Sequence, residues 1–106
     1  MSEEDIELVA QECGFDSKQK VAFQIILHDC NITNLDDLYS QEINLDRLSI
    51  RLYSKCKPHT VAGVIYKLAE REMISKVLDK DGNIPKEKIL SQVNAYFERK
   101  LEEPDR

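Results

Sequence analysis

The sequence predicts an all-α domain, a bundle of five or six helices around one buried central helix. Apolar residues recur at spacings of three and four along most of the 106-residue chain, as they do on the buried face of an α-helix. Only three glycines and three prolines interrupt this pattern. The segment Lys57–Glu70 is apolar around most of its circumference, and such a helix must be surrounded by other elements. We therefore expect this segment to form the centre of the bundle.

The N-terminal part of the chain predicts two helices with recognisable boundaries. Ser2 is followed three residues later by Asp5, a spacing typical of a helix N-cap, and Gly14 is suited to end the same helix. Asp16 and Gln19 repeat the capping pattern before a second helix, which runs to about residue 30. The buried faces are predicted from the apolar spacing: Ile6, Leu8, Val9 and Cys13 in the first helix, and Val21, Ala22, Ile25, Ile26 and Cys30 in the second.

The middle of the chain predicts shorter elements. Residues 31–34 break the periodicity, and Asn34 can cap a short amphipathic helix over residues 35–39. Residues 44–53 form a second amphipathic piece. The alternation over residues 50–52 also fits a short strand, but an isolated strand has no partner to pair with.

The central helix is predicted to begin at Pro58, because proline is favoured at the first helical position. Its apolar pattern continues through Leu78 or bends near Glu72. Gly63 lowers helix stability by about 1 kcal/mol relative to alanine, which close approach of a neighbouring backbone could offset.

The C-terminal part predicts a turn and a closing helix. Residues 79–83 have the composition of a turn. Pro85 opens the last helix, whose apolar residues recur at helical spacing as far as Leu101. We expect a single helical domain over residues 1–103 and a short tail over residues 104–106.

Charge is distributed unevenly along the chain, whose net charge is −5. Residues 1–50 carry three basic and eleven acidic side chains, whereas residues 51–106 carry twelve basic and nine acidic ones. No acidic residue occurs between Arg47 and Ala69. Such a segment can form a basic surface that attracts a polyanion or an acidic partner, or simply a solvated helix face.

Composition also indicates a compartment. No apolar run has the length of a membrane span, and the acidic N-terminus differs from the basic start of a secretory signal. Cys13, Cys30 and Cys56 are odd in number and widely separated, which is typical of reduced thiols. We expect an intracellular protein, cytoplasmic or nuclear, with no membrane partner.

No set of residues predicts catalysis or a cofactor. His28 and His59 have no nucleophile or carboxylate at a recognisable spacing, and the glycines stand singly rather than in a phosphate-binding loop. The cysteines and histidines lack the paired spacing of a zinc site. Residues 77–88 resemble a calcium loop around Gly82, but both end ligands are missing. We expect no enzyme, no metal and no cofactor.

Four motifs share the order of a known helical repeat: a turn after the first helix, an alanine in the second, a basic-proline start of the central helix, and an aromatic end of the last helix. They are Cys13-Gly14-Phe15, Val21-Ala22, Lys57-Pro58 through Tyr66, and Tyr96-Phe97 through Leu101. Together they resemble one cyclin-like repeat of the kind found in the core of transcription factor IIB and archaeal transcription factor B. The resemblance implies a non-enzymatic adaptor in transcription or chromosome-related regulation, which binds a protein partner and possibly DNA.

Basic residues supply the candidate partner or DNA contacts. The side chains at positions 86 and 88 would reach phosphate from the first turn of the last helix, and the glutamine one turn later could touch a base edge. The acid-rich N-terminal half favours a protein partner over a DNA duplex. The candidate contacts are Arg47, Arg51, Lys55, Lys57, Lys86, Lys88 and Gln92.

Two other hypotheses remain open at this point, and the oligomeric state is not predicted. Residues 58–74 also resemble the recognition helix of a winged-helix DNA-binding regulator. That hypothesis predicts a strand pair after Ile74, with residues 77–78 before a turn at Asp81-Gly82 and Ile84 after it. Alternatively, the chain is a structural helical subunit of a larger assembly, with an exposed interface of Leu35, Leu38, Tyr39, Leu48 and Leu52.

Overall fold

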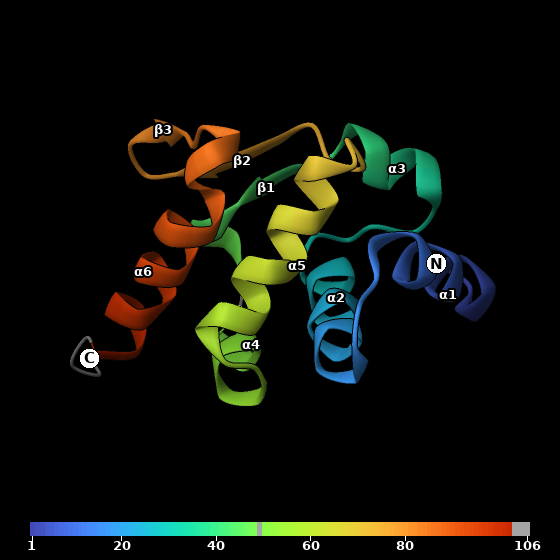
Figure 1. Ribbon diagram of the computed structural model, residues 1–106, viewed down its shortest axis with the longest axis horizontal. Coiled ribbons are helices and arrows are strands. Elements are labelled where there is room, and N and C mark those ends of the chain that lie inside the picture. Colours follow the sequence, from blue (N-terminus) through green and yellow to red (C-terminus); the bar gives the residue numbers. More distant parts are fainter. Residues whose placement is uncertain (49, 103–106) are drawn as a thin grey trace.

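The computed structural model describes residues 1–48 and 50–102, apart from the side chains of Ile50, Arg51 and Tyr53 (Figure 1). Most of this part is helical, as predicted. The elements follow in the order α1 (Glu3–Cys13), α2 (Ser17–Asp29), α3 (Leu35–Ser40), β1 (Glu42–Asn44), the 3-10 helix η1 (Leu45–Arg47), α4 (Ile50–Lys55), α5 (Pro58–Glu70), β2 (Lys76–Asp79), β3 (Gly82–Asn83), the 3-10 helix η2 (Lys86–Lys88) and α6 (Ile89–Glu102).

Four of the predicted helix starts are confirmed. The Ser2 side chain accepts a hydrogen bond from the Asp5 N–H and caps α1. Asp16 and Gln19 form a reciprocal capping box at the start of α2, in which each side chain accepts from the other residue's backbone N–H. The Asn34 side chain accepts from the Asp37 N–H and caps α3, and Pro58 is the first residue of α5.

Three helices end in the same reversal of the chain. A residue one or two positions beyond each helix end has a left-handed backbone: Gly14, Asn31 and Glu72, with φ of 68°, 58° and 58°. In α5 the Met73 N–H donates to the Leu68 carbonyl at 2.8 Å, which is the six-to-one bond of a Schellman motif. The bend predicted near Glu72 is therefore present, and the alternative of a helix continuing through Leu78 is wrong.

A small sheet corrects the all-α prediction. β1 pairs parallel with β2, with Ile43 opposite Val77, and β2 pairs antiparallel with β3, with Leu78 opposite Asn83. The middle positions Ile43 and Val77 are buried. These strands of two to four residues are too short for an alternating pattern to predict them. The alternative of a strand over residues 50–52 is wrong, because these residues belong to the helix α4, and the strand in this part of the chain is β1.

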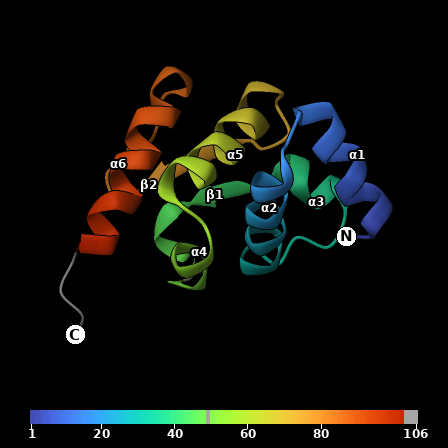
Figure 2. The same cartoon turned by 60° about the horizontal axis from the view of Figure 1, so that its bottom comes forward.

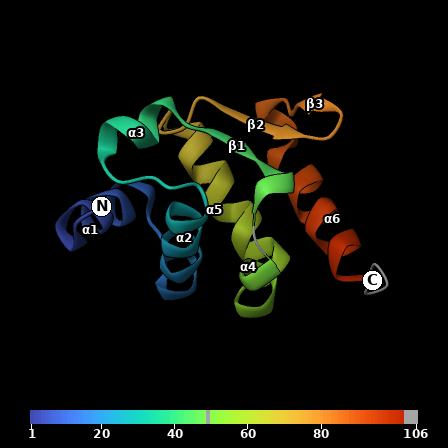
Figure 3. The same cartoon turned by 180° about the vertical axis from the view of Figure 1, so that it is seen from behind.

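The helix α5 is the centre of the core, as predicted. It lies between α2 and α6, and α4 packs near its start (Figures 1 and 2). Seen from behind, β1 and β2 cross the face of α5 (Figure 3). Its buried residues pack with fully buried side chains of the neighbouring helices, Phe23 of α2 and Phe97 of α6 among them. None of the helices in the described ranges is long and apolar enough to cross a bilayer.

The exposed interface of the structural-subunit hypothesis is not formed. Leu38, Leu48 and Leu52 are buried in the core, because the short elements between α2 and α5 fold inward against it. Leu35 is partly buried, and Tyr39 is the exposed member of the predicted set.

The start of the last helix also differs from its prediction. Pro85 precedes the 3-10 helix η2, and α6 begins only at Ile89. Lys86 and Lys88 therefore lie in a 3-10 turn and not in the first turn of an α-helix. The predicted tail over residues 104–106 and the domain end at residue 103 lie outside the described residues.

Candidate functional site

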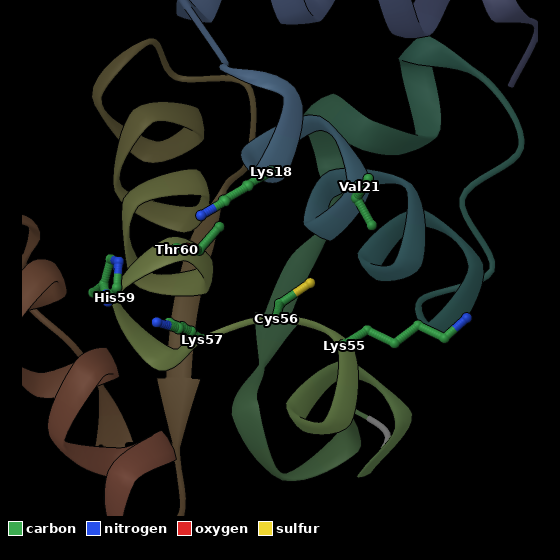
Figure 4. A pocket seen from close by; sticks show the side chains of 7 residues that line it. All are labelled: Lys18, Val21, Lys55, Cys56, Lys57, His59 and Thr60. Atoms are coloured by element: carbon green, nitrogen blue, oxygen red, sulfur yellow. The ribbon is translucent and has the colours of Figure 1, made fainter.

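A pocket of about 280 Å³ lies where the start of α2 meets the connection between α4 and α5 (Figure 4). We call it the cationic pocket, because three lysines and a histidine line it and none of the described lining residues is a carboxylate. Its lining residues are Lys18, Val21, Lys55, Cys56, Lys57, His59 and Thr60.

The first turn of α5 forms one wall of the cationic pocket. Lys57 occupies the N-cap position and makes no side-chain capping bond, and Pro58 follows it at the first helical position. In this described turn Pro58 has no N–H and the Thr60 N–H donates to the Lys57 carbonyl at 3.0 Å, which leaves the His59 N–H as a backbone donor for an anion. The helix dipole also favours negative charge at this end. In α2 the Asp16 carboxylate occupies this position, whereas in α5 no side chain does.

Thr60 gives the pocket a buried polar group. It is the buried polar side chain of the described core, 7% exposed, and its hydroxyl has no hydrogen-bond partner there. Within residues 1–48 and 50–102, every fully enclosed side-chain nitrogen or oxygen has a partner. The Thr60 hydroxyl is therefore not fully enclosed, and the pocket that it lines is its route to solvent. A buried hydroxyl without a partner is expensive unless water or a ligand satisfies it.

The cations of the pocket are not neutralised by neighbouring residues. None of Lys18, Lys55 and Lys57 has a carboxylate within 4 Å in the described part of the chain. Figure 4 shows Lys18 extending toward Thr60, with Lys57 and His59 on the same side at the start of α5. The Lys55 side chain extends away from them on the opposite side. Lys18 and Lys57 are thus the amines available to one small anion.

The thiol of Cys56 does not make the pocket a nucleophilic site. Burial raises the pKa of Cys56, and the charge of Lys55 lowers it by less. Burial also raises the pKa of Cys30, to about 11, with a further increase from Asp29 and a decrease from Arg47. Since the thiolate is the reactive form, these thiols stay protonated and unreactive near neutral pH. The pocket can bind an anion but offers no activated cysteine.

Lys67 links the two helices that line the pocket, α5 and α2. Its Nζ donates to the Gly14 carbonyl at 2.9 Å and to the Gln19 Oε1 at 3.0 Å, which joins α5 to the turn before α2. The same Gln19 oxygen accepts from the Asp16 N–H. Lys67 belongs to the acid-free segment 47–69, but its charge is used inside the fold. It positions Lys18, the residue before Gln19, beside the start of α5.

The other predicted contacts lie elsewhere. Lys86 donates to the Glu70 carbonyl at 3.4 Å, at the C-terminal end of α5, so the 13 residues of α5, about 20 Å, separate it from Lys57. Lys88 and Gln92 are exposed nearby at the start of α6. Arg47 is exposed in η1, close enough to Cys30 to affect its thiol. The backbone of Arg51 belongs to α4, and its side chain lies outside the description.

Of the predicted contacts, Lys55 and Lys57 thus line one pocket from opposite sides, and Lys86, Lys88 and Gln92 lie at the other end of the central helix. Sequence reasoning missed Lys18 and Thr60. Lys18 lies in a different helix, far from Lys57 along the chain, so only the packing of α2 against α5 places it here. Thr60 could have been found as a polar residue directly before the apolar run Val61-Ala62, in a helix that starts without a capping side chain.

A second hollow has a different character. Asp46, Lys80, Tyr96, Arg99 and Lys100 line a smaller space of about 70 Å³. The Tyr96 hydroxyl donates to the Asp46 carboxylate, and Lys100 lies over the Tyr96 ring at 5.5 Å. This hollow therefore has a carboxylate among its lining residues, and one of its lysines already lies against an aromatic ring. No group of three metal-binding side chains occurs among the residues described.

Comparison of the chain with protein-family models, with curated proteins and with solved structures gave no significant match. The geometry of the cationic pocket is therefore the basis on which a function can be argued.

Proposed function

We propose that this chain is a non-catalytic, cyclin-like adaptor in transcription or chromosome-related regulation, which binds an acidic segment of a protein partner at the cationic pocket. The observation that carries this proposal is the convergence of Lys18, Lys57 and the uncapped start of α5 on one pocket without a carboxylate. Opposite charge across an interface steers association and fixes the partner's orientation.

The enclosure of α5 supports the cyclin-like part of the proposal. The helix begins at Pro58, as the Lys57–Tyr66 motif implies, and it is buried between α2 and α6. The three-stranded sheet is an addition to the helical bundle that the resemblance implies.

The charge around the pocket favours a protein segment over duplex DNA. The outer face of α1 exposes Glu3, Glu4 and Glu7, which belong to the strongly acidic first half of the chain. A duplex long enough to contact the whole domain would meet this face and be repelled. A flexible peptide can enter the pocket and avoid it.

The test is retention of a partner by pocket variants. Immobilised protein is incubated with native lysate in three forms: the wild type, a variant with Lys18→Glu and Lys57→Glu, and a control with Lys76→Glu and Lys80→Glu. The control makes the same charge change on exposed positions outside the pocket. We expect the wild type and the control to retain the same protein and the pocket variant to lose it. Equal retention by all three contradicts the proposal.

A second candidate function, a winged-helix DNA-binding regulator, is favoured by the strand pair after Ile74. β2 and β3 occupy Lys76–Asp79 and Gly82–Asn83, and the Ile84 N–H donates to the Val77 carbonyl at 2.8 Å, as that hypothesis predicts for a short hairpin. Duplex DNA titrated at two salt concentrations tests it. Four phosphate contacts, from Lys55, Lys57, Lys86 and Lys88, would give a salt slope of about −3.6. Absence of binding at low salt excludes this candidate.

A further inference from the structure

We propose that the cationic pocket binds the phosphoryl group of a phosphoserine or phosphothreonine in the partner protein. This inference deepens the proposed function and rests on it, because it names the chemistry of the acidic segment. The anion would lie between Lys18 and Lys57, against the first turn of α5, with the Thr60 hydroxyl donating to one of its oxygens.

The donors of the pocket match a phosphoryl dianion. A phosphorylated side chain carries a charge of about −1.5 to −2 and three strong acceptor oxygens. Lys18, Lys57, His59 and Thr60 all line the same pocket, at the start of α5 where no side chain caps the helix. A single carboxylate has one charge and two oxygens, so it would leave part of this set without a partner.

Thr60 is the independent evidence for a ligand here. The uncapped start of α5 attracts anions in general, but it does not explain a hydroxyl that is 7% exposed and lacks a partner in the described structure. Such a group needs an acceptor within reach inside the pocket. A phosphoryl oxygen supplies one in a place where the amines already favour negative charge.

The pocket also has an apolar side that suits a peptide. Val21 is 45% exposed and lines the pocket beside Cys56. An apolar residue next to the phosphorylated one could cover Val21, which a DNA backbone would not do as well. The next basic pair, Lys86 and Lys88, lies about 20 Å away along α5, so the pocket holds one phosphate rather than a row of them.

The first measurement is a titration with inorganic phosphate, followed in ¹H–¹⁵N correlation spectra of the whole chain. We expect saturable shifts of the His59, Thr60 and Val61 amide signals. Thr60→Val keeps the size of the side chain and removes the hydroxyl, and Lys57→Gln removes one amine. Loss of one hydrogen bond to a charged group should weaken binding roughly ten-fold or more. The control Lys76→Gln, at an exposed position of strand β2, should leave the dissociation constant unchanged.

The second measurement separates the sources of the phosphoryl group. A degenerate phosphoserine peptide pool, the same pool without phosphate, an aspartate-substituted pool and a duplex of random sequence are each used to displace inorganic phosphate. We expect displacement by the phosphoserine pool at the lowest concentration. Spectra of each variant are recorded first, so that a variant that fails to fold is recognised and replaced by Lys18→Gln.

The outcomes distinguish this inference from the proposed function. If the aspartate pool competes as well as the phosphoserine pool, the phosphoryl inference is overturned and an acidic partner is still supported. If the duplex competes best, the pocket serves DNA and both statements about a protein partner fail. If phosphate causes no saturable shift at the start of α5, or Thr60→Val and Lys57→Gln bind it like the wild type, the site does not exist as described.

Discussion

Substitution of Gly63 by alanine tests the contact between α5 and α2 most directly. A Cβ atom at Gly63 would lie 3.0 Å from the Gln19 Nε2. The sequence predicted that a neighbouring backbone explains this glycine, but the neighbour is a side chain. Gln19 is not free to move, because its Oε1 accepts from the Asp16 N–H at 3.1 Å and from the Lys67 Nζ at 3.0 Å.

The magnitude follows from two opposing effects. Alanine in place of glycine within a helix stabilises it by about 1 kcal/mol. Displacing Gln19 to make room for the methyl group costs its two hydrogen bonds, about 1 kcal/mol each. Gly63→Ala should therefore lower the free energy of unfolding by about 1 kcal/mol in the wild type. In a Gln19→Ala background, where the bonds are already lost, the same change should raise it by about 1 kcal/mol.

Equilibrium urea unfolding of the four proteins in this cycle measures both values. The expected coupling free energy between the two positions is about 2 kcal/mol, well above the error of such a cycle. Gln24→Ala, on the exposed face of α2, is the control for a glutamine-to-alanine change and should couple to Gly63→Ala by less than about 0.5 kcal/mol. If Gly63→Ala stabilises the wild type as much as it stabilises the Gln19→Ala protein, Gln19 moves aside at no cost and the reasoning is wrong.

Three further predictions concern single positions. Glu72→Gly should raise the free energy of unfolding by about 0.5–1 kcal/mol, because glycine removes the cost of a left-handed backbone. The control Gln24→Gly, inside α2, should lower the free energy of unfolding by about 1 kcal/mol. Urea midpoints that move in the same direction for both variants would contradict this. Phe97→Ala should destabilise the protein by about 3–5 kcal/mol, because Phe97 is fully buried, and Leu101→Ala on the exposed part of α6 should change little, both measured by thermal unfolding. The stabilising contribution of the protonated Cys30 thiol should be complete below pH 9 and lost as the pH rises toward 11, since the pKa is higher in the folded state, about 11, than its ordinary value of 9. Cys30→Ser should flatten this part of the stability profile, and an unchanged slope would show that Cys30 does not cause it.

The helices could be predicted because their signals are local. Ser2, Asp16 and Asn34 each cap the helix they precede, and these caps depend only on residues three positions away. Pro58 fixes the start of α5 by its own backbone geometry. A local signal of this kind survives in the folded chain because tertiary packing does not compete with it.

The sheet could not be predicted because its signal is not local. β1 has three residues, and its partner β2 follows more than thirty residues later. An isolated apolar residue such as Ile43 gives no indication of a strand, and Val77 matches the continued helical pattern equally well. An end of α5 before Val77 would have pointed to the strand. The sequence marks this end weakly, because Glu72 takes the left-handed position of the Schellman motif, where glycine is usual.

The cationic pocket and the contact at Gly63 both depend on the packing of α2 against the same face of α5. Thr60, Gly63 and Lys67 follow one another at spacings of three and four, so they lie on the face of α5 toward α2. Lys18 precedes Gln19 in the first turn of α2, so a change that moves this turn of the backbone away from Gly63 also moves Lys18 relative to Thr60. Gly63 therefore allows the close approach that forms the pocket, and the stability that a helix loses by containing glycine is offset by the capping network beside it. This dependence explains why the site is not visible in the sequence. Lys18 and Lys57 belong to different parts of the chain, and the distance between α2 and α5 depends on Gly63 and Gln19, which do not line the pocket.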